Sequence, residues 1–374
     1  MKKVRLFAVG VIIILIGYVG WYHSSIHPGE FFDFDGESPS GLTGAVSNAL
    51  SIPEHTYIVA SNTPQFVVLS FDGSKSLQML NETLAFEKEM VAINKPLHFT
   101  YFINAAYFLT QANAGLYQPP GRHPNGSSNI GFSDSASDIS KRVKAFNDAV
   151  NSGNEIASHA VGHFNGSNWT AEEWKQEFSS FNTILFNAQK NNLPEKIEPW
   201  VISSQQIIGF RAPNLGVDPN LYQNLRDFHF LYDSSGVGNP RNWPKKDSYG
   251  IWHIPLGEIR IGLRRSPAAA MDYSLWIHQS RGKNTVTKGS DGWNMDFDEI
   301  EKSYMQYFDA NYIGSRAPVI IANHFSKWND GLYWEAMKKF AHNVCGKPLV
   351  RCVSFKELVA YLNTEGIPQT ISAQ

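Results

Sequence analysis

Short apolar runs alternate with longer amphipathic stretches from residue 66 onwards. The short runs are apolar on both faces and rich in β-branched and aromatic residues, which predicts buried strands. They cover residues 66–71, 97–103, 155–158, 207–210, 230–232, 252–259, 317–322 and 350–355. The stretches between them have helical periodicity and cover residues 74–93, 139–151, 170–191, 219–228, 297–314 and 331–344. Strands of this kind, separated by helices, predict an α/β fold with a parallel sheet. About seven or eight such units fit a distorted or incomplete parallel (β/α) barrel.

The N-terminus begins with a basic stretch and continues with an apolar one. Lys2, Lys3 and Arg5 precede residues 6–22, which carry no charge and end in aromatic residues, as at a membrane interface. An apolar run of about 17 residues reaches the lower limit for a membrane-spanning helix. We expect an uncleaved membrane anchor over residues 1–22, with the rest of the chain in the periplasm or at the cell surface. A cleaved signal segment, and hence a secreted protein, is the alternative.

Composition divides the rest of the chain. Residues 23–64 are rich in Gly, Ser and Pro and predict a linker and lead-in, residues 65–363 predict one large domain, and residues 364–374 predict a C-terminal tail. The net charge of −2 gives no indication of the basic surface that binds nucleic acid. The two cysteines, Cys345 and Cys352, lie close together in the sequence. An external location permits a disulfide between them, and two free thiols are the alternative.

Polar residues stand at the ends of several predicted strands. Asp72 follows the first strand, His159 follows the strand 155–158, Arg211 follows 207–210, and His324 follows 317–322. Because reactive residues of parallel α/β folds gather at the C-terminal ends of the strands, we expect these side chains to meet. The loop 115–138 is long and polar, and we expect it to form one rim of a cleft.

His159 and His163 lie four residues apart. On a helical turn they would share a face and could bind one cation together. Imidazole suits zinc, with cobalt or nickel as alternatives. Taken singly, the other residues have ordinary explanations: Asp72 could cap a helix, Arg211 could form a structural ion pair, and His324 could pack beside Trp328. One hydrolytic reaction that uses all of them together is the more economical interpretation.

Several short motifs, in order along the chain, resemble those of a known family. The segments are Leu-Ser-Phe-Asp-Gly at 69–73, Ser-His-Ala-Val-Gly-His at 158–163, Gly-Phe-Arg-Ala-Pro-Asn at 209–214 and Ala-Asn-His at 322–324. Over about residues 66–362 the chain resembles the polysaccharide deacetylases, the family 4 carbohydrate esterases. Segments 232–235, 252–256, 316–318 and 323–325 are similar to the chitin deacetylase-like branch.

The resemblance implies a distorted parallel (β/α) barrel, a divalent metal ion (zinc, or cobalt or nickel) and an acetylated polysaccharide or oligosaccharide substrate. Carried over by position, His159 and His163 are metal ligands and Asp72 is the general base. The resemblance implies further that Arg211 orients Asp72 and that His324 is the general acid.

Two more roles follow from the same resemblance. The backbone N–H of Asn214 helps to hold the oxyanion, and Asp272 orients His324. The expected activity is the removal of acetyl groups, with N-acetyl favoured, from a polysaccharide outside the cytoplasm.

One position departs from the family's pattern. The family has two adjacent aspartates in its first motif, a base and then a metal ligand, and Gly73 occupies the second position here. Water, Asp72 itself or a residue of the loop 134–138 could take the place of the missing ligand. The departure also allows a non-catalytic relative that only binds glycan. A third alternative is a hydrolase of the same chemistry that acts on small cyclic amides or ureides.

Overall fold

The computed structural model describes residues 57–58, 62–262, 265–368 and 371–372, all of which fall in the compact unit Val46–Gln374. The predicted anchor over residues 1–22 and most of the predicted lead-in over 23–64 lie outside the described residues. Within the described ranges, no helix combines the length and the apolar character needed to cross a membrane.

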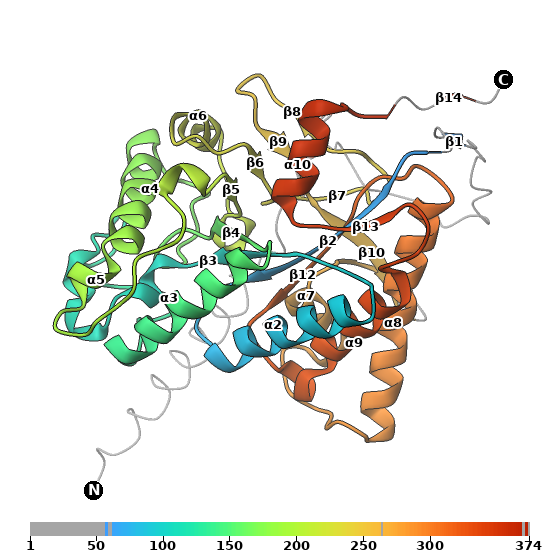
Figure 1. Cartoon of the computed structure of the whole chain (residues 1–374), viewed down its shortest axis with the longest axis horizontal. Helices are drawn as coiled ribbons and strands as arrows, with labels where there is room; N and C mark the ends of the chain where they lie inside the picture. Colours follow the sequence, from blue (N-terminus) through green and yellow to red (C-terminus); the bar gives the residue numbers. More distant parts are fainter. Residues whose placement is uncertain (1–56, 59–61, 263–264, 369–370, 373–374) are drawn as a thin grey trace, which may run out of the picture. The chain divides into compact units, whose positions relative to one another are not determined.

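A curled sheet forms the centre of the molecule (Figure 1). Its strands follow the order β12–β2–β3–β4–β5–β6–β9–β8, and β13 also pairs with β2. All pairs are parallel except β8 with β9. The strands are β2 (Gln65–Asp72), β3 (Phe99–Ile103), β4 (Glu155–Ser158), β5 (Gly209–Phe210), β6 (Tyr232–Asp233), β8 (Lys245–Lys246), β9 (Trp252–His253), β12 (Val319–His324) and β13 (Val350–Cys352).

A smaller sheet lies beside the β12 edge. It consists of β7 (Val237–Gly238), β10 (Leu256–Ile261) and β11 (Ser266–Ala269) in the order β11–β10–β7. A bridge between Met271 and Ala322 connects its end to β12. The short strands β1 (Tyr57–Ile58) and β14 (Ile371–Ser372) pair with each other. The arrangement confirms the predicted α/β fold with an incomplete parallel barrel.

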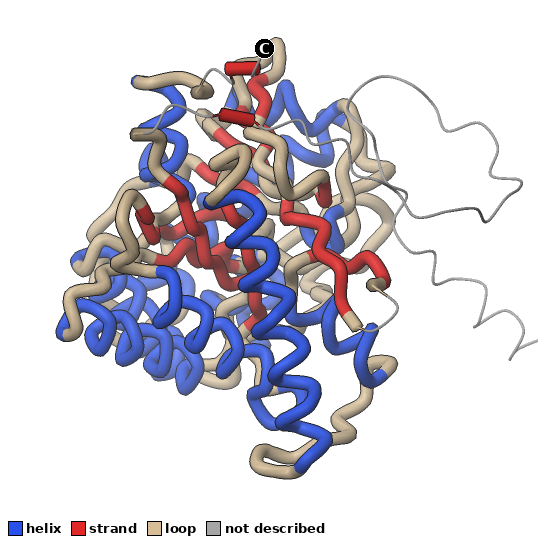
Figure 2. The backbone as a smooth tube through the Cα atoms, turned by 90° about the vertical axis from the view of Figure 1, so that its right-hand side faces the viewer, coloured by secondary structure: helices blue, strands red, loops and turns tan. Residues whose placement is uncertain are grey.

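Helices cover the outside of the strands, as Figures 1 and 2 show. They are α2 (Leu77–Ala92), α3 (Ala136–Asn151), α4 (Ala171–Phe186), α5 (Ala188–Asn191), α6 (Asn220–Asp227), α7 (Asp272–Ser280), α8 (Asp291–Tyr312), α9 (Trp328–Val344) and α10 (Phe355–Thr364). Short 3-10 helices add η1 (Ala105–Phe108), η2 (Gln111–Leu116), η3 (Ser204–Gln206) and η4 (Pro213–Leu215). The sequence predicted six of the helical regions and missed α7 and α10.

The predicted strand 350–355 was wrong at its end. The strand stops at Cys352, and Ser354 begins a helix by accepting the N–H of Glu357, whose carboxylate accepts the N–H of Ser354 in return. This capping box was readable in the sequence. The predicted strand 252–259 is likewise two strands, β9 and β10, separated by residues 254–255.

Alternation along β2 decides which side chains enter the barrel. Val67, Leu69 and Phe71 join the outer core that packs against the helices. Phe66 and Val68 join the inner core of the barrel. Because side chains of a strand alternate between its two faces, Ser70 and Asp72 continue the inner row of Phe66 and Val68, and Asp72 ends it at the C-terminal mouth.

The other end of the barrel is closed by α10. Phe355 at the start of this helix is fully buried in the inner core. A disulfide between Cys345 and Cys352 joins the end of α9 to β13, which confirms the first of the two alternatives for the cysteines.

Candidate functional site

Asp72 and His324 occupy paired positions on adjacent parallel strands, β2 and β12. Asp72 is 3% exposed, whereas the His324 side chain keeps 27% of its surface exposed. The charge of Asp72 influences the pKa values of His159, His163 and His324. The structure therefore brings together the carboxylate and the three histidines that the sequence predicted to meet.

Arg211 holds Asp72 from inside the barrel. Its side chain is fully buried, and its Nη1 donates to Oδ1 of Asp72 at 2.6 Å and to Oγ of Ser70 at 3.1 Å. Its guanidinium lies over the ring of Phe102, 4.1 Å from the ring centroid. No described residue donates a hydrogen bond to Oδ2, the other oxygen of Asp72. The arginine thus fixes one carboxylate oxygen and leaves the second for another partner.

A serine pair fixes Arg211 in turn. Nε of Arg211 donates to the backbone oxygen of Ser234 at 3.1 Å, and Nη2 donates to Oγ of Ser234 at 2.9 Å. Oγ of Ser235 accepts the N–H of Ala212 at 2.7 Å and is hydrogen-bonded to the Asp233 carboxylate. The segment 232–235, singled out by its resemblance, therefore supports the arginine rather than lining the mouth of the barrel.

The histidine pair lies on an irregular turn rather than on a helical one. His159 follows β4 directly, and Ala160 and His163 have φ angles of 58° and 59°, in the left-handed region. The two rings are nevertheless neighbours, with centroids 5.1 Å apart. The left-handed conformations of Ala160 and His163 bend the chain and bring the two rings together without a helix.

The backbone oxygen of Arg211 orients the His159 ring and leaves one of its two nitrogens available. Nδ1 of His159 lies 2.6 Å from the backbone oxygen of Arg211 and must donate to it, which leaves Nε2 as the free acceptor. Burial lowers the pKa of His159 to about 3 and also lowers that of His163. Both imidazoles are therefore neutral at pH 7, as metal ligands must be.

The imidazoles of His159 and His163 are donors that fit a divalent metal ion. Among the described residues, no group of three or more His, Cys, Asp or Glu side chains is arranged to hold a metal ion. At Gly73, whose φ is +92°, an added Cβ would meet no atom within 4 Å. Open space therefore stands where an aspartate at position 73 would project, and His159 and His163 are the two side chains that would hold a metal ion.

The loop 134–138 does not supply the missing ligand. Asp134 is exposed and lies 4.0 Å from Nζ of Lys75. Asp138 accepts the hydroxyl of Ser135 and pairs with Lys141 at the start of α3. The longer loop 115–138 contacts the turn of the histidine pair through Asn129, whose N–H donates to the backbone oxygen of Gly162. That this loop forms one rim of a cleft stays a prediction.

Asp272 holds His324, as the resemblance implied. Oδ1 of Asp272 lies 2.7 Å from Nδ1 of His324, and Oδ2 accepts the backbone N–H of His324 at 2.7 Å. Asp272 is 2% exposed and begins α7. The aspartate fixes the tautomer of His324 and leaves Nε2 of the ring directed away from it.

The surroundings of Asp72 and His324 shift the pKa values of the two side chains in opposite directions. Burial favours the neutral form of Asp72, but the charge of Arg211, aided by His159 and His324, outweighs it and lowers the pKa of Asp72. Burial also works against a charged His324, but Asp272 outweighs it and raises the pKa of His324 above its ordinary value. Two groups whose environments push their pKa values apart are suited to base and acid roles.

Asn214 is exposed and has a left-handed backbone conformation. Its φ is 55°, and no described residue accepts its N–H. The residue follows Arg211 by one short turn, η4, and is exposed. Its N–H is thus available to a ligand at the mouth of the barrel.

Aromatic side chains beside His324 were not singled out by the sequence as part of the site. Tyr273 is 47% exposed, and its ring centroid lies 6.2 Å from that of His324. Trp328 stacks on Trp276, with ring centroids 4.7 Å apart. Tyr273 and Trp276 lie on α7, which the sequence did not predict, and Trp328 begins α9.

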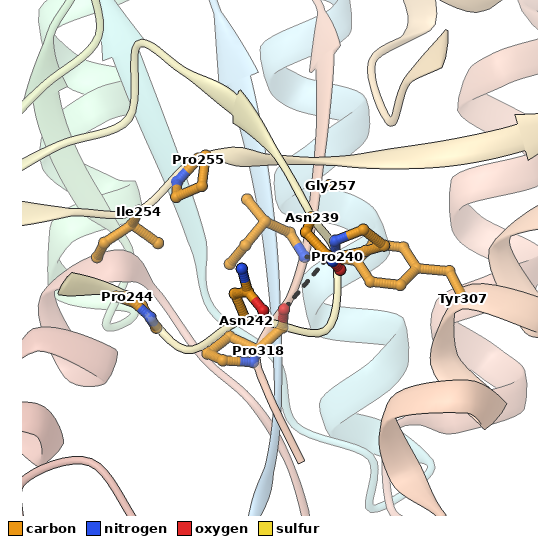
Figure 3. Close-up of a pocket in the computed structure, with 10 residues that line it drawn as sticks. Asn239, Pro240, Asn242, Pro244, Ile254, Pro255, Gly257, Tyr307 and Pro318 are labelled. Carbon is orange, nitrogen blue, oxygen red and sulfur yellow. Dashed lines mark hydrogen bonds between the residues drawn. The ribbon is translucent and has the colours of Figure 1, made fainter. Parts of the chain in front are cut away.

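A cavity of ≈ 10 Å³ lies at the opposite end of β12 (Figure 3). Its walls include Pro240, Pro255, Tyr307 and Pro318. A volume of this size holds about one water molecule, so the cavity is too small for a substrate.

The fold matches a solved structure along almost its whole length. A Mycobacterium smegmatis protein assigned to the polysaccharide deacetylases is 13% identical to this chain, with a TM-score of 0.52, and the match covers 85% of this chain and 98% of that one. The chain has the polysaccharide deacetylase fold. This confirms the fold that the resemblance implied, whereas the chitin deacetylase-like branch stays a prediction.

Other matches to this deacetylase fold are weaker. A family 4 acetyl xylan esterase from Clostridium thermocellum, in complex with cobalt, is 14% identical, covers 81% of this chain and 93% of its own, and has a TM-score of 0.41. A family 4 pseudoenzyme from Bacillus anthracis is 11% identical, covers 80% and 66%, and has a TM-score of 0.38. We base no inference on scores this low. No sequence-family model and no curated protein matches the chain.

Proposed function

We propose that this protein hydrolyses acetyl groups, with N-acetyl favoured, from a polysaccharide or oligosaccharide in a metal-dependent reaction. The observation that carries the proposal is the pairing of Asp72 with His324 across β2 and β12, each held by a buried partner of opposite charge. The deacetylase fold and the neutral pair His159 and His163 support it. The proposed metal is zinc, with cobalt or nickel as alternatives.

Asp72 is the proposed general base. Arg211 occupies Oδ1, so Oδ2 takes the proton of the attacking water. The lowered pKa of Asp72 keeps it ionised at neutral pH. A metal ion bound by His159 and His163 would lower the pKa of bound water and polarise the substrate carbonyl.

His324 is the proposed general acid. Its raised pKa favours the protonated ring, which gives its Nε2 proton to the leaving amine or alcohol. The N–H of Asn214 stabilises negative charge on the carbonyl oxygen, and such donors often make the largest single contribution to catalysis. Arg211 and Asp272 act through Asp72 and His324 and are positioning residues.

The proposed substrate lies outside the cytoplasm. The disulfide between Cys345 and Cys352 supports an oxidising location. The apolar residues 6–22 support either an anchor or a secretion signal. The aromatic rings of Tyr273 and Trp328 near His324 suit contact with sugar rings.

Acetate release from N-acetylglucosamine oligomers by the purified protein tests the proposal. We expect release that a chelator abolishes and that added Zn²⁺ or Co²⁺ restores. His324→Ala should reduce the rate by about 10²–10⁴-fold while the thermal midpoint stays close to that of the wild type. Equal rates for wild type and His324→Ala would contradict the assignment.

A second candidate function is glycan binding without catalysis. Gly73 in place of a ligand, and the lack of a three-ligand group among the described residues, favour it. Calorimetry with the same oligomers separates the two functions. Binding without any acetate release, in protein loaded with Zn²⁺ or Co²⁺, would favour the second.

A further inference from the structure

A buried carboxylate lies behind the turn that carries the histidine pair. Glu177 is on α4 and is fully buried. Its Oε1 accepts the backbone N–H of Val161 at 2.7 Å, and its Oε2 accepts the hydroxyl of Tyr117 at 2.8 Å. Val161 stands midway between His159 and His163, so Glu177 is hydrogen-bonded to the backbone of the turn.

The turn needs such support because its conformation is unfavourable. Ala160 and His163 are both in the left-handed region, which side chains other than glycine disfavour and which persists only where surrounding contacts impose it. The carbonyl groups of Ala160 and Val161 accept N–H groups from η1, at Ala105 and Ala106. The N–H of Val161 has no strand or helix partner, and Glu177 accepts it.

A carboxylate is a costly side chain to bury. Burial raises the pKa of Glu177 to about 7, which records the free-energy penalty of keeping it charged away from water. An apolar side chain would fill the same space without this penalty but would leave the Val161 N–H buried and unpaired. The advantage of a carboxylate over an apolar side chain at position 177 is therefore its hydrogen bond to the turn.

We infer that Glu177 is a positioning residue for the histidine pair, holding the turn through Val161 so that His159 and His163 face one metal ion. This inference rests on the proposed metal-dependent function. Tyr117 fixes Glu177 from its other oxygen and belongs to the same support. Residues that support the metal ligands without touching the metal influence metal affinity, because they determine the orientation of the ligands before the metal binds.

The chain offers a closely matched control. Glu155 is also buried, and its carboxylate also accepts a tyrosine hydroxyl, from Tyr232 at 3.0 Å, and a backbone N–H, from Lys356 at 2.7 Å. Burial raises its pKa to about 7 as well. Glu155 begins β4, whereas His159 follows the end of that strand. Changes at Glu155 therefore reproduce the loss of a buried carboxylate without touching the turn.

The test is a titration of the metal-free full chain with Co²⁺, followed by the visible absorption of the bound ion. Glu177→Ala should weaken Co²⁺ binding by about 10–100-fold, and Glu177→Gln, which keeps an acceptor for Val161, should recover most of the affinity. Glu155→Ala should bind Co²⁺ as the wild type does. Amide exchange of residues 159–163 in the metal-free protein should be faster in Glu177→Ala alone.

Unchanged Co²⁺ affinity in Glu177→Ala, or an equal loss in Glu155→Ala, would overturn the inference. If an alanine variant does not fold, Tyr117→Phe and Tyr232→Phe repeat the comparison with smaller changes, and only Tyr117→Phe should weaken Co²⁺ binding. Acetate release is measured separately. Loss of Co²⁺ binding in Glu177→Ala, in a protein that releases no acetate, would support the positioning role and contradict the proposed activity.

Discussion

Arg211 and Asp72 form an ion pair that solvent does not reach. Nη1 of the arginine lies 2.6 Å from Oδ1 of the aspartate, and their side chains are 0% and 2% exposed. Asp72 ends β2 and Arg211 directly follows β5, and β3 and β4 separate these two strands in the sheet. A buried pair of this kind is held by further contacts, here Ser70, Ser234 and the ring of Phe102. This geometry commits one oxygen of Asp72 to Arg211 and leaves the other for the proposed role as general base.

Asp72→Asn should remove the base and keep the acceptor for Arg211. We expect acetate release to fall by about 10²–10⁴-fold. The uncompensated guanidinium should also lower the stability, because breaking a buried ion pair is costly. Rate assays below the unfolding temperature and thermal unfolding measure the two effects separately. A variant that keeps the wild-type rate would exclude Asp72 as the base.

Asp272→Asn should change the pH dependence through His324. The acid form of His324 exists below its pKa, so activity should be lost as pH rises through that value, which Asp272 raises above 6.5. Removing the negative charge lowers this pKa and should move the alkaline limb of the kcat/KM profile to lower pH. A profile that keeps its alkaline limb in Asp272→Asn would contradict the role of His324 as acid.

Gly73→Asp should add the missing carboxylate beside the histidine pair. A Cβ at this position meets no atom within 4 Å, but the φ of +92° strains any residue other than glycine. We expect tighter Co²⁺ binding together with a loss of stability of about 1–3 kcal/mol. Gly250, with φ +86° and equally open space, is the matched control. Gly250→Asp should carry a similar strain and leave Co²⁺ affinity unchanged, and a gain in both variants would contradict the prediction.

Glu155→Gln should change how stability depends on pH. In the folded protein burial raises the pKa of Glu155 from 4.5 to about 7, so between these values the folded state holds a proton that the unfolded chain has lost. The free energy of unfolding contributed by this group therefore falls as pH rises from about 4.5 to about 7, by on the order of 3 kcal/mol. Urea unfolding at several pH values measures it.

The difference in the free energy of unfolding between the wild type and Glu155→Gln, taken at each pH, isolates the contribution of Glu155. Buried His159, whose pKa is about 3 in the folded state, contributes the opposite slope as pH rises from about 3 to about 6.5, and it is present in both proteins. Parallel pH profiles for the two proteins would show that Glu155 is not protonated in the folded state at pH 5–6.

Several features of the site were predictable from local patterns. Asp72, His159, Arg211 and His324 each end or follow a buried strand, and parallel strands deliver their C-terminal residues to one edge. The period of two along a strand then determines that Asp72 lies on the same face as Val68. These patterns are local, and they predicted the folded arrangement because the sheet is regular.

Other features depended on partners far along the chain. The turn that carries His159 and His163 is irregular rather than helical, and Glu177, η1 and Asn129 hold it in that conformation. The aromatic rings beside His324 come from α7 and the start of α9, and α7 begins at Asp272, whose carboxylate is bound to His324.

The sequence by itself determined most of the strands of the parallel barrel, six of its helical regions and the residues that reach its mouth, because hydrophobic periodicity and strand alternation are properties of neighbouring residues. Only the tertiary structure decided which oxygen of Asp72 is free, how the two histidine rings approach each other and which carboxylates support them. These depend on hydrogen bonds between residues separated by up to 139 positions, as between Asp72 and Arg211, and no local pattern specifies such contacts.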